Sequence, residues 1–299
     1  QEVYLMSEKK PKKKILLRVI IIICLICFLV SGGILGYYWY EYWSMDNIAQ
    51  QAVELTEQTP TPEQIDALPE GAQDEAGAAY AANPDYIATI TIPDTVIHYA
   101  VVKSKDNKDY LTTNFYGNYS RLGTIFTDYR CIIEPNEMSD NIVIYGHNAN
   151  NGSFFHHLLD YKNTSFANNH SIVHFNTIYG DGTYVVVGAF LYDPTTIAED
   201  SFPYYGYIDF YNEDRFAEFQ NQINQRSYFH TSLDWNSSDQ YITLSTCAYD
   251  VKDARFVVVA RKLREGETED SVKGTYTTNG NVRMPNDWYL DRRMDNPFI

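Results

Sequence analysis

Residues 241–250 read YITLSTCAYD. The first seven of them, 241–247, form an apolar and β-branched run that ends in a single cysteine, Cys247. Such a run predicts a buried β-strand, because β-branched and aromatic side chains fit the pleated surface of a sheet. A second run of this kind, RFVVVARKL at 255–263, follows after seven residues. Two strands joined by so short a connection are expected to pair antiparallel, which brings Arg255 back beside Cys247.

Six more runs of the same type lie upstream, each bounded by turn-forming residues. They are YIATITI (86–92), VIHYAVV (96–102), GTIFTD (123–128), NIVIYG (141–146), SIVHF (171–175) and TYVVVGAFLY (183–192). Eight short strands with polar loops predict one β-barrel or sandwich. Two segments have helical periodicity instead, at 153–161 and 212–227. The sequence therefore predicts a mainly β fold with short helices.

An apolar run, VIIIICLICFLVSGGILG at 19–36, contains no charge and is long enough to cross a hydrocarbon core. Basic residues precede it, and the aromatic cluster YYWYEYW (37–43) follows it. We therefore expect a transmembrane signal anchor over 19–40, with the amino terminus in the cytoplasm and the rest outside. A cleaved signal peptide is the alternative, but no small-residue cleavage site precedes the aromatic cluster.

The chain is thus expected to have five parts. A basic cytoplasmic segment (1–18) and the anchor (19–40) precede an extracellular spacer (41–84), in which a short helix is possible from 44 to about 57. A β-domain follows at 85–264, and a polar, loosely ordered tail of unknown role occupies 265–299, in which Trp288, Tyr289 and Leu290 are candidates to dock on the rest of the chain. The spacer is rich in Pro, Ala and acidic residues. We expect it to be an extended spacer. The alternative, which stays open, is that part of it forms a helix that packs on the β-domain.

Composition excludes several classes of function. The net charge of −16 argues against a nucleic-acid partner, because phosphate binding requires a basic surface. Four cysteines are too few for a disulfide scaffold, and Cys24 and Cys27 lie inside the apolar run, where we interpret them as small apolar residues. No cluster of His, Cys or carboxylate residues has metal-ligand spacing. No cofactor is expected, and Cys131, which has no companion motif, is interpreted as structural.

A nucleophilic cysteine needs thiolate character and a proton donor for the leaving group, which is most often histidine. Among seven histidines, His147 ends an apolar strand directly before a Gly- and Asn-rich loop, a place where a rigid scaffold presents functional groups. Arg255 cannot lose its proton and would serve as a fixed donor to an oxyanion. The simpler alternative is a buried free cysteine with a surface arginine.

The motifs taken together resemble those of a sortase. They are YGHN (145–148), TLSTC (243–247) and the arginine eight residues further on, and the segments DNKDYL (106–111), GTIFTD and NGSFFHHLLDY resemble class B specifically. The resemblance covers roughly residues 84–264, and it leaves the tail unexplained. It implies an eight-stranded sortase-type β-barrel.

The resemblance implies a membrane-anchored transpeptidase of a Gram-positive cell surface that acts on secreted proteins bearing a carboxy-terminal sorting signal of the NPxTx type. Cys247 would attack the carbonyl after the threonine and Arg255 would stabilise the oxyanion. His147 would protonate the departing amine. The thioester would then pass to an amine of peptidoglycan or of a pilin.

By match to family positions, Asn107, Leu111 and Ser245 would line the substrate groove, with the loop from about 195 to 207 as another wall. Position 248 is alanine, where some class B members carry a polar residue that contacts substrate, which leaves the signal specificity open. Asp250 is a further candidate to orient His147, although an acidic loop residue is more often solvated.

Three alternatives remain. A papain-like or amidase-type cysteine hydrolase is disfavoured because papain-type chains place the cysteine before the histidine. An inactive sortase-like or adhesin-type surface-binding protein explains the anchor and the acidity, but not the cysteine and its arginine. Matches to N-x-S/T at Asn118, Asn151, Asn163 and Asn236 suggest a eukaryotic secreted protein, and the scarcity of cysteines argues against it.

Overall fold

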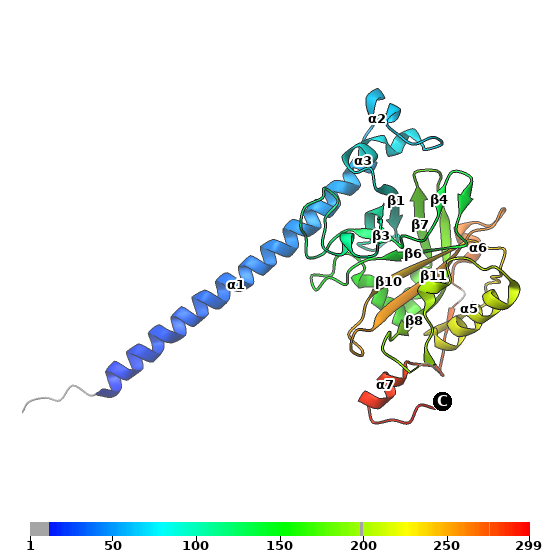
Figure 1. Ribbon diagram of the computed structural model, residues 1–299. Helices are drawn as coiled ribbons and strands as arrows, with labels where there is room; N and C mark the ends of the chain where they lie inside the picture. The colour runs from blue at the N-terminus through cyan, green and yellow to red at the C-terminus, as the bar shows by residue number, and fades with distance from the viewer. Residues whose placement is uncertain (1–11, 198–199, 275) are drawn as a thin grey trace, which may run out of the picture. The chain divides into compact units, whose positions relative to one another are not determined.

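The computed structural model describes residues 12–197, 200–274 and 276–299. It divides into two units, one that ends at Ser44 and one that comprises Met45–Ile299. Helix α1 (Lys12–Thr56) is a single unbroken helix (Figure 1). Within the described residues, its stretch Ile15–Thr56 is the one helix long and apolar enough to cross a membrane.

The short helix expected from 44 to about 57 is not a separate element. It is the carboxy-terminal part of α1, which ends at Thr56. The reason lies in the sequence, because no Gly or Pro interrupts residues 37–56 and nothing there ends the helix. Ala52 and Val53, near the end of α1, are buried at 1% and 3% exposure.

Eight strands close into one barrel (Figure 1), which confirms the predicted fold class. In spatial order they are β1 (Tyr86–Thr91), β2 (His98–Lys103), β3 (Ile125–Thr127), β6 (Asn141–Tyr145), β10 (Tyr241–Cys247), β11 (Arg255–Lys262), β8 (Thr183–Tyr192) and β7 (Ile172–Thr177). Each corresponds to one of the eight predicted runs, with ends that differ by a few residues. The sandwich alternative is therefore wrong.

Helix α5 (Glu213–Arg226) confirms the predicted helix at 212–227. The Asn212 side chain accepts a hydrogen bond from the Arg215 backbone, which caps its first turn. Its buried face presents Phe216 and Phe219 to Tyr241 of β10. Burying an aromatic side chain in this way contributes about 1.5–3 kcal/mol.

The segment predicted to be helical at 153–161 contains a 3₁₀-helix, η3 (His156–Lys162), followed by α4 (Thr164–Asn169). The remaining short elements in the described residues are α2 (Pro62–Asp66), η1 (Asp74–Ala76), α3 (Gly77–Ala82), η2 (Asp109–Leu111), β4 (Ile133–Glu134), β5 (Glu137–Met138), η5 (Tyr204–Gly206), β9 (Phe229–Thr231), α6 (Glu269–Val272), β12 (Tyr276–Thr278) and α7 (Asn286–Asp291).

The segment after α1 packs on the barrel, as the second of the two expectations for it states. Ala76, Ala78 and Ala79 are buried. The backbone N–H of Gln73 donates to the carbonyl of Ile178, in the loop after β7, at 2.7 Å. These contacts make residues 73–82 part of the second unit.

The tail after residue 264 is ordered, and the expectation that it is loosely ordered is wrong. Strand β12 pairs antiparallel with β9, and the buried ring of Tyr276 donates from its hydroxyl to the carbonyl of Val186 at 2.6 Å. Glu267 binds the guanidinium of Arg261, which is 1% exposed, through two bonds of 2.5 and 2.7 Å. Buried rings and ion pairs hold this segment, and apolar periodicity does not detect such anchors.

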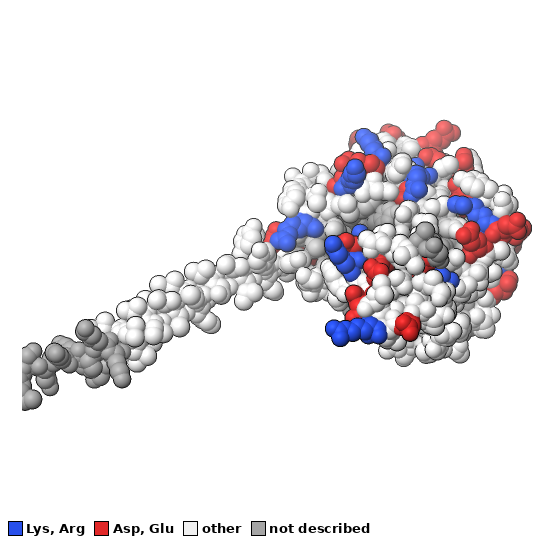
Figure 2. All heavy atoms as spheres, turned by 60° about the horizontal axis from the view of Figure 1, so that its bottom comes forward, with Lys and Arg blue, Asp and Glu red and all other residues white. Residues whose placement is uncertain are grey.

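Charged side chains of both signs are interspersed on the face of the second unit that Figure 2 displays. The net charge of −16 is therefore not gathered into one acidic patch on this face.

Candidate active site

Strand pairing brings the three predicted catalytic residues together. Strands β6 and β10 are parallel, with Tyr145 opposite Ser245. Two residues further along both strands, this register leads to His147 and Cys247. Strands β10 and β11 are antiparallel, and Cys247 lies directly opposite Arg255. Directly opposed residues project to the same face of a sheet, so Cys247 and Arg255 lie side by side at this end of the barrel.

These residues line one cavity of about 370 Å³. All six predicted site residues contribute to it: Asn107, Leu111, His147, Ser245, Cys247 and Arg255. Six further lining residues were not predicted individually: Phe126, Arg130, Tyr145, Gly146, Tyr205 and Thr246. Tyr205 belongs to the loop expected to form another wall. Phe126, Tyr145, Gly146 and Thr246 lie at or next to strand ends, a signal that could have found them, whereas Arg130 lies in the loop after β3 and has no such signal.

A backbone carbonyl holds the imidazole of His147, which is half-buried. Its Nε2 lies 2.9 Å from the carbonyl oxygen of Leu111, and because a carbonyl only accepts, Nε2 donates. Gly123 permits this placement of Leu111. Its φ is +56°, and a Cβ there would lie 2.1 Å from the carbonyl oxygen of Tyr110.

The loop after His147 is tied to the strand of Cys247. The Asn148 amide nitrogen donates to the Cys247 carbonyl at 2.9 Å, and its amide oxygen accepts from Nδ1 of His156 at 2.7 Å. The backbone N–H of Phe155 returns to the carbonyl of His147 at 3.0 Å. The Phe155 ring packs so closely on Gly146 that a Cβ there would lie 2.6 Å from it. The loop is therefore a compact turn with fixed ends.

The guanidinium of Arg255 is held by its own turn. Its Nη1 donates to the carbonyls of Asp253, at 2.8 Å, and Ala254, at 3.1 Å. A guanidinium has five N–H donors, so within the described structure the donors on its other nitrogens remain for a ligand in the cavity. A preorganised cation of this kind stabilises negative charge that develops beside it.

A buried carboxylate, Asp128, binds three of the side chains that line the cavity. Asp128 has no exposed side-chain surface, and it accepts two bonds of 2.8 Å from the guanidinium of Arg130. Asn107 donates to it at 2.8 Å and Tyr145 at 3.0 Å. Burial raises the pKa of Asp128, but the hydrogen bonds from these three residues outweigh it, and the pKa lies below its usual value. Asp128 therefore fixes three side chains that line the cavity, and sequence patterns did not indicate it.

Ser245 lines the cavity and is buried. Its hydroxyl shares a hydrogen bond of 2.6 Å with Tyr204 of η5. Both side chains are buried, and burial raises the pKa of Tyr204 well above its usual range. The bond thereby attaches the loop at 200–207 to β10, two residues before Cys247.

Two other candidates lie elsewhere. Cys131 is buried, and burial raises the pKa of its thiol to about 12, in agreement with a structural role. Asp250 binds Lys162 at 2.6 Å, whereas the imidazole of His147 binds the Leu111 carbonyl. The hypothesis that Asp250 orients His147 is wrong for this structure. No group of three or more His, Cys, Asp or Glu side chains in the described ranges is arranged to hold a metal ion.

Comparison with known proteins gives consistent matches. The family model of the Sortase domain matches residues 90–263. Sortase B of Staphylococcus aureus is 31% identical over 184 residues, which cover 61% of this chain and 72% of the relative. Sortase B of Listeria monocytogenes is 30% identical over 234 residues, which cover 77% and 90%.

Solved structures agree. The S. aureus sortase B–substrate complex aligns with a TM-score of 0.63 at 25% identity, over 76% of this chain and all of that chain. Sortase B from Bacillus anthracis in complex with AAEK1 aligns with a TM-score of 0.63 at 26% identity, over the same shares.

Proposed function

The chain belongs to the sortase family as a class B member, a cysteine transpeptidase, and from this premise we propose that Cys247, His147 and Arg255 carry out its reaction. The observation that supports this assignment most directly is the strand register. Residue 255 lies opposite 247, the β6–β10 pairing leads to 147 beside 247, and all three line one cavity.

In the first step the Cys247 thiolate, whose proton is held by His147, attacks the carbonyl carbon of the substrate amide, and the carbonyl oxygen becomes an oxyanion. Donors of Arg255 stabilise that charge where it develops. The C–N bond then breaks, His147 gives its proton to the departing amine, and a thioester remains on Cys247. Forming the thioester divides one difficult amide exchange into two easier steps.

In the second step an incoming amine attacks the thioester. His147, now neutral, takes the proton of that amine, and the Cys247 thiolate leaves as the new amide forms. The proton that His147 gives to the departing amine in the first step is its Nε2 proton, which in the described structure is donated to the Leu111 carbonyl. Because Leu111 also lines the cavity, a bound substrate that displaces this carbonyl redirects the proton to the reaction.

The substrate class we propose is a secreted protein with a carboxy-terminal sorting signal of the NPxTx type, cleaved after its threonine. Asn107, Leu111 and Ser245 line the cavity and would contact the signal peptide. The acceptor would be an amine of a peptidoglycan precursor or of a pilin. A solved complex of S. aureus sortase B with a substrate supports the binding of a substrate by this fold.

We further propose that residues 19–40 anchor the enzyme in the plasma membrane as a single pass, with residues 1–18 in the cytoplasm and the barrel, 85–264, outside. The uncharged apolar stretch of α1 supports the anchor. In protoplasts that express Cys131→Ala, a membrane-impermeant maleimide should label Cys247 without lysis. Labelling only after lysis would reverse the orientation.

The test of the reaction uses the full chain in detergent micelles with a quenched NPQTN-type peptide and intact-mass detection. The parent should cleave the peptide and carry a thioester adduct, and Cys247→Ala should do neither. Cys131→Ala is the matched control, since it removes a cysteine outside the cavity, and it should keep both activities. Candidate amines added in turn then identify the acceptor.

Absence of an adduct with any of a panel of five-residue signals, together with a Cys247 thiol no more reactive than free cysteine, would overturn the proposal. The inactive surface-binding alternative would then account for the chain. Cleavage that survives Cys247→Ala would assign the chemistry to another residue.

A further inference from the structure

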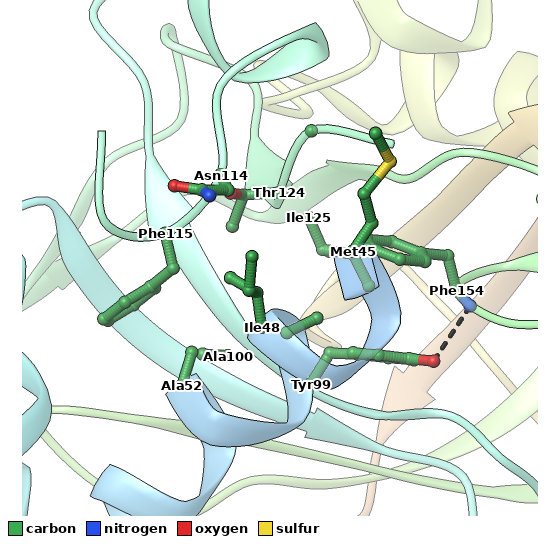
Figure 3. Close-up of a pocket in the computed structure, with 12 residues that line it drawn as sticks. Met45, Ile48, Ala52, Tyr99, Ala100, Asn114, Phe115, Thr124, Ile125 and Phe154 are labelled. Carbon is green, nitrogen blue, oxygen red and sulfur yellow. Dashed lines mark hydrogen bonds between the residues drawn. The ribbon is translucent and has the colours of Figure 1, made fainter. Parts of the chain in front are cut away.

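The carboxy-terminal part of α1, residues 45–56, is built into the second unit, and we refer to it as the stem. Its apolar side chains face the barrel across a pocket of only about 10 Å³, room for at most about one water molecule. Figure 3 shows Met45, Ile48 and Ala52 of the stem beside Tyr99, Ala100 and Ile125 of the barrel strands and Phe154 of a loop. The pocket is too small for a ligand, so this surface is a packing interface.

One side chain at this interface makes hydrogen bonds in two directions. Tyr99 of β2 is 2% exposed, and its hydroxyl donates to Oδ1 of Asp46 in the stem at 3.3 Å. The same hydroxyl accepts from the backbone N–H of Phe154 at 2.9 Å, the dashed line in Figure 3. Burial, followed by the charge of Asp46, raises the pKa of Tyr99 well above its usual range, so the hydroxyl keeps the proton that it donates.

Phe154 belongs to the loop that carries His147. Its φ is +55°, in the left-handed region that is unfavourable for a residue with a bulky side chain. Its ring stacks on that of Tyr99, with centroids 5.1 Å apart and an interplanar angle of 18°. Phe154 also bridges Asn148 across the loop, and the next residue, Phe155, donates to the carbonyl of His147. The contacts with Tyr99 thus hold an unfavourable backbone conformation at the residue next to Phe155, which hydrogen-bonds to His147.

We propose that Tyr99 is a positioning residue that links the stem to the His147 loop, so that the stem is required for full transpeptidase activity. Asp46 orients the hydroxyl of Tyr99, and the hydroxyl and ring of Tyr99 hold Phe154 in place. The loop that contains Phe154 then holds His147 at the distance from Cys247 that proton transfer needs. The inference rests on the proposed role of His147 as proton donor.

The test uses the full chain in detergent micelles and two substrates with the same acyl group. One is the peptide amide, whose amine leaving group must be protonated. The other is the p-nitrophenyl ester, whose leaving group needs no proton. Tyr99→Phe removes the hydroxyl and keeps the ring. Because small displacements of a catalytic group are costly, the single-turnover rate constant of acylation by the amide should fall by about tenfold, while that of acylation by the ester and the half-saturating concentration of either substrate change less than about twofold.

Matched variants separate this effect from loss of stability. Tyr276→Phe removes another buried tyrosine hydroxyl, which donates to the Val186 carbonyl, and should leave the amide-to-ester ratio unchanged. Asp46→Ala should lower the ratio as Tyr99→Phe does, whereas Asp46→Asn, which keeps an acceptor oxygen, should restore it. All variants are assayed well below their unfolding temperatures.

His147→Asn distinguishes failure of the inference from failure of the proposed function. A large loss on the amide alone for His147→Asn, with a smaller loss of the same kind for Tyr99→Phe, supports the inference. The same result for His147→Asn with an unchanged ratio for Tyr99→Phe overturns the inference and leaves the proposed function standing. An unchanged ratio for His147→Asn overturns both.

Discussion

Replacing Asp128 with asparagine tests whether the buried carboxylate supports the cavity wall. Its two oxygens accept five hydrogen bonds. Oδ1 accepts from the backbone N–H and the Nε of Arg130, and Oδ2 from the Nη2 of Arg130, from Asn107 and from Tyr145. Whichever way the new carboxamide turns, its NH₂ group faces hydrogen-bond donors. The neutral carboxamide also no longer forms an ion pair with Arg130.

The magnitude follows from this loss. A hydrogen bond to a charged group contributes about 1.5–3 kcal/mol, and the carboxamide loses at least two of the five, so the change should cost about 3–5 kcal/mol. At about 2–4 °C per kcal/mol for a domain of this size, the midpoint of thermal unfolding should fall by about 6–20 °C at pH 7. Near-ultraviolet circular dichroism of the full chain in detergent micelles measures it. Asp250→Asn, the same change in a partly exposed pair with Lys162, should cost about 1 kcal/mol or less.

The pH dependence gives a second check. Because the folded-state pKa of Asp128 is lowered, its contribution is fully present above the unfolded pKa of about 3.9 and is lost as the pH falls through the folded value. The difference in unfolding free energy between parent and Asp128→Asn should therefore be constant from pH 7 to about pH 5 and shrink below it. A difference under about 1 kcal/mol at pH 7, or one that grows on acidification, would refute the reasoning.

Three further predictions concern the site and the tail. Arg255→Lys should lower kcat/KM of peptide cleavage by about 10²–10³-fold, the loss typical of an oxyanion donor, and undiminished cleavage would remove Arg255 from the mechanism. Gly146→Ala should lower the free energy of unfolding by about 1–3 kcal/mol, because the new Cβ overlaps the Phe155 ring. An unchanged midpoint of urea unfolding would show that the Phe155 ring moves aside without a cost in stability. Glu267→Ala should cost about 3–5 kcal/mol in urea unfolding, since it leaves the buried charge of Arg261 without its carboxylate, and a cost under about 1 kcal/mol would show that the tail does not stabilise it.

The barrel could be predicted from the sequence because its strands are local signals. Each is a β-branched run between turn-forming residues, as 183–192 and 241–247 illustrate. The site could be predicted for a related reason. His147, Cys247 and Arg255 stand at or next to strand ends, where position along the chain already indicates position in the fold.

The supporting contacts could not be predicted, because they join residues far apart in sequence without any periodic pattern. Asp128 accepts a hydrogen bond from Asn107, which is 21 residues away in the sequence, and another from Tyr145, which is 17 residues away. Arg261 lies in a strand run whose charged end looks solvent-exposed, yet its guanidinium is buried against Glu267. Such polar anchors also explain why the tail, expected to be loose, is ordered.

The parallel pairing of β6 with β10 also bears on how the chain folds. The histidine and the thiol become neighbours only through contacts that join residues about a hundred positions apart, and loop-closure entropy makes such contacts late and slow to form. No hairpin or other local intermediate can assemble the pair. We therefore expect a partly folded molecule to expose an ordinary thiol, and the appearance of catalysis to mark the closing of the barrel.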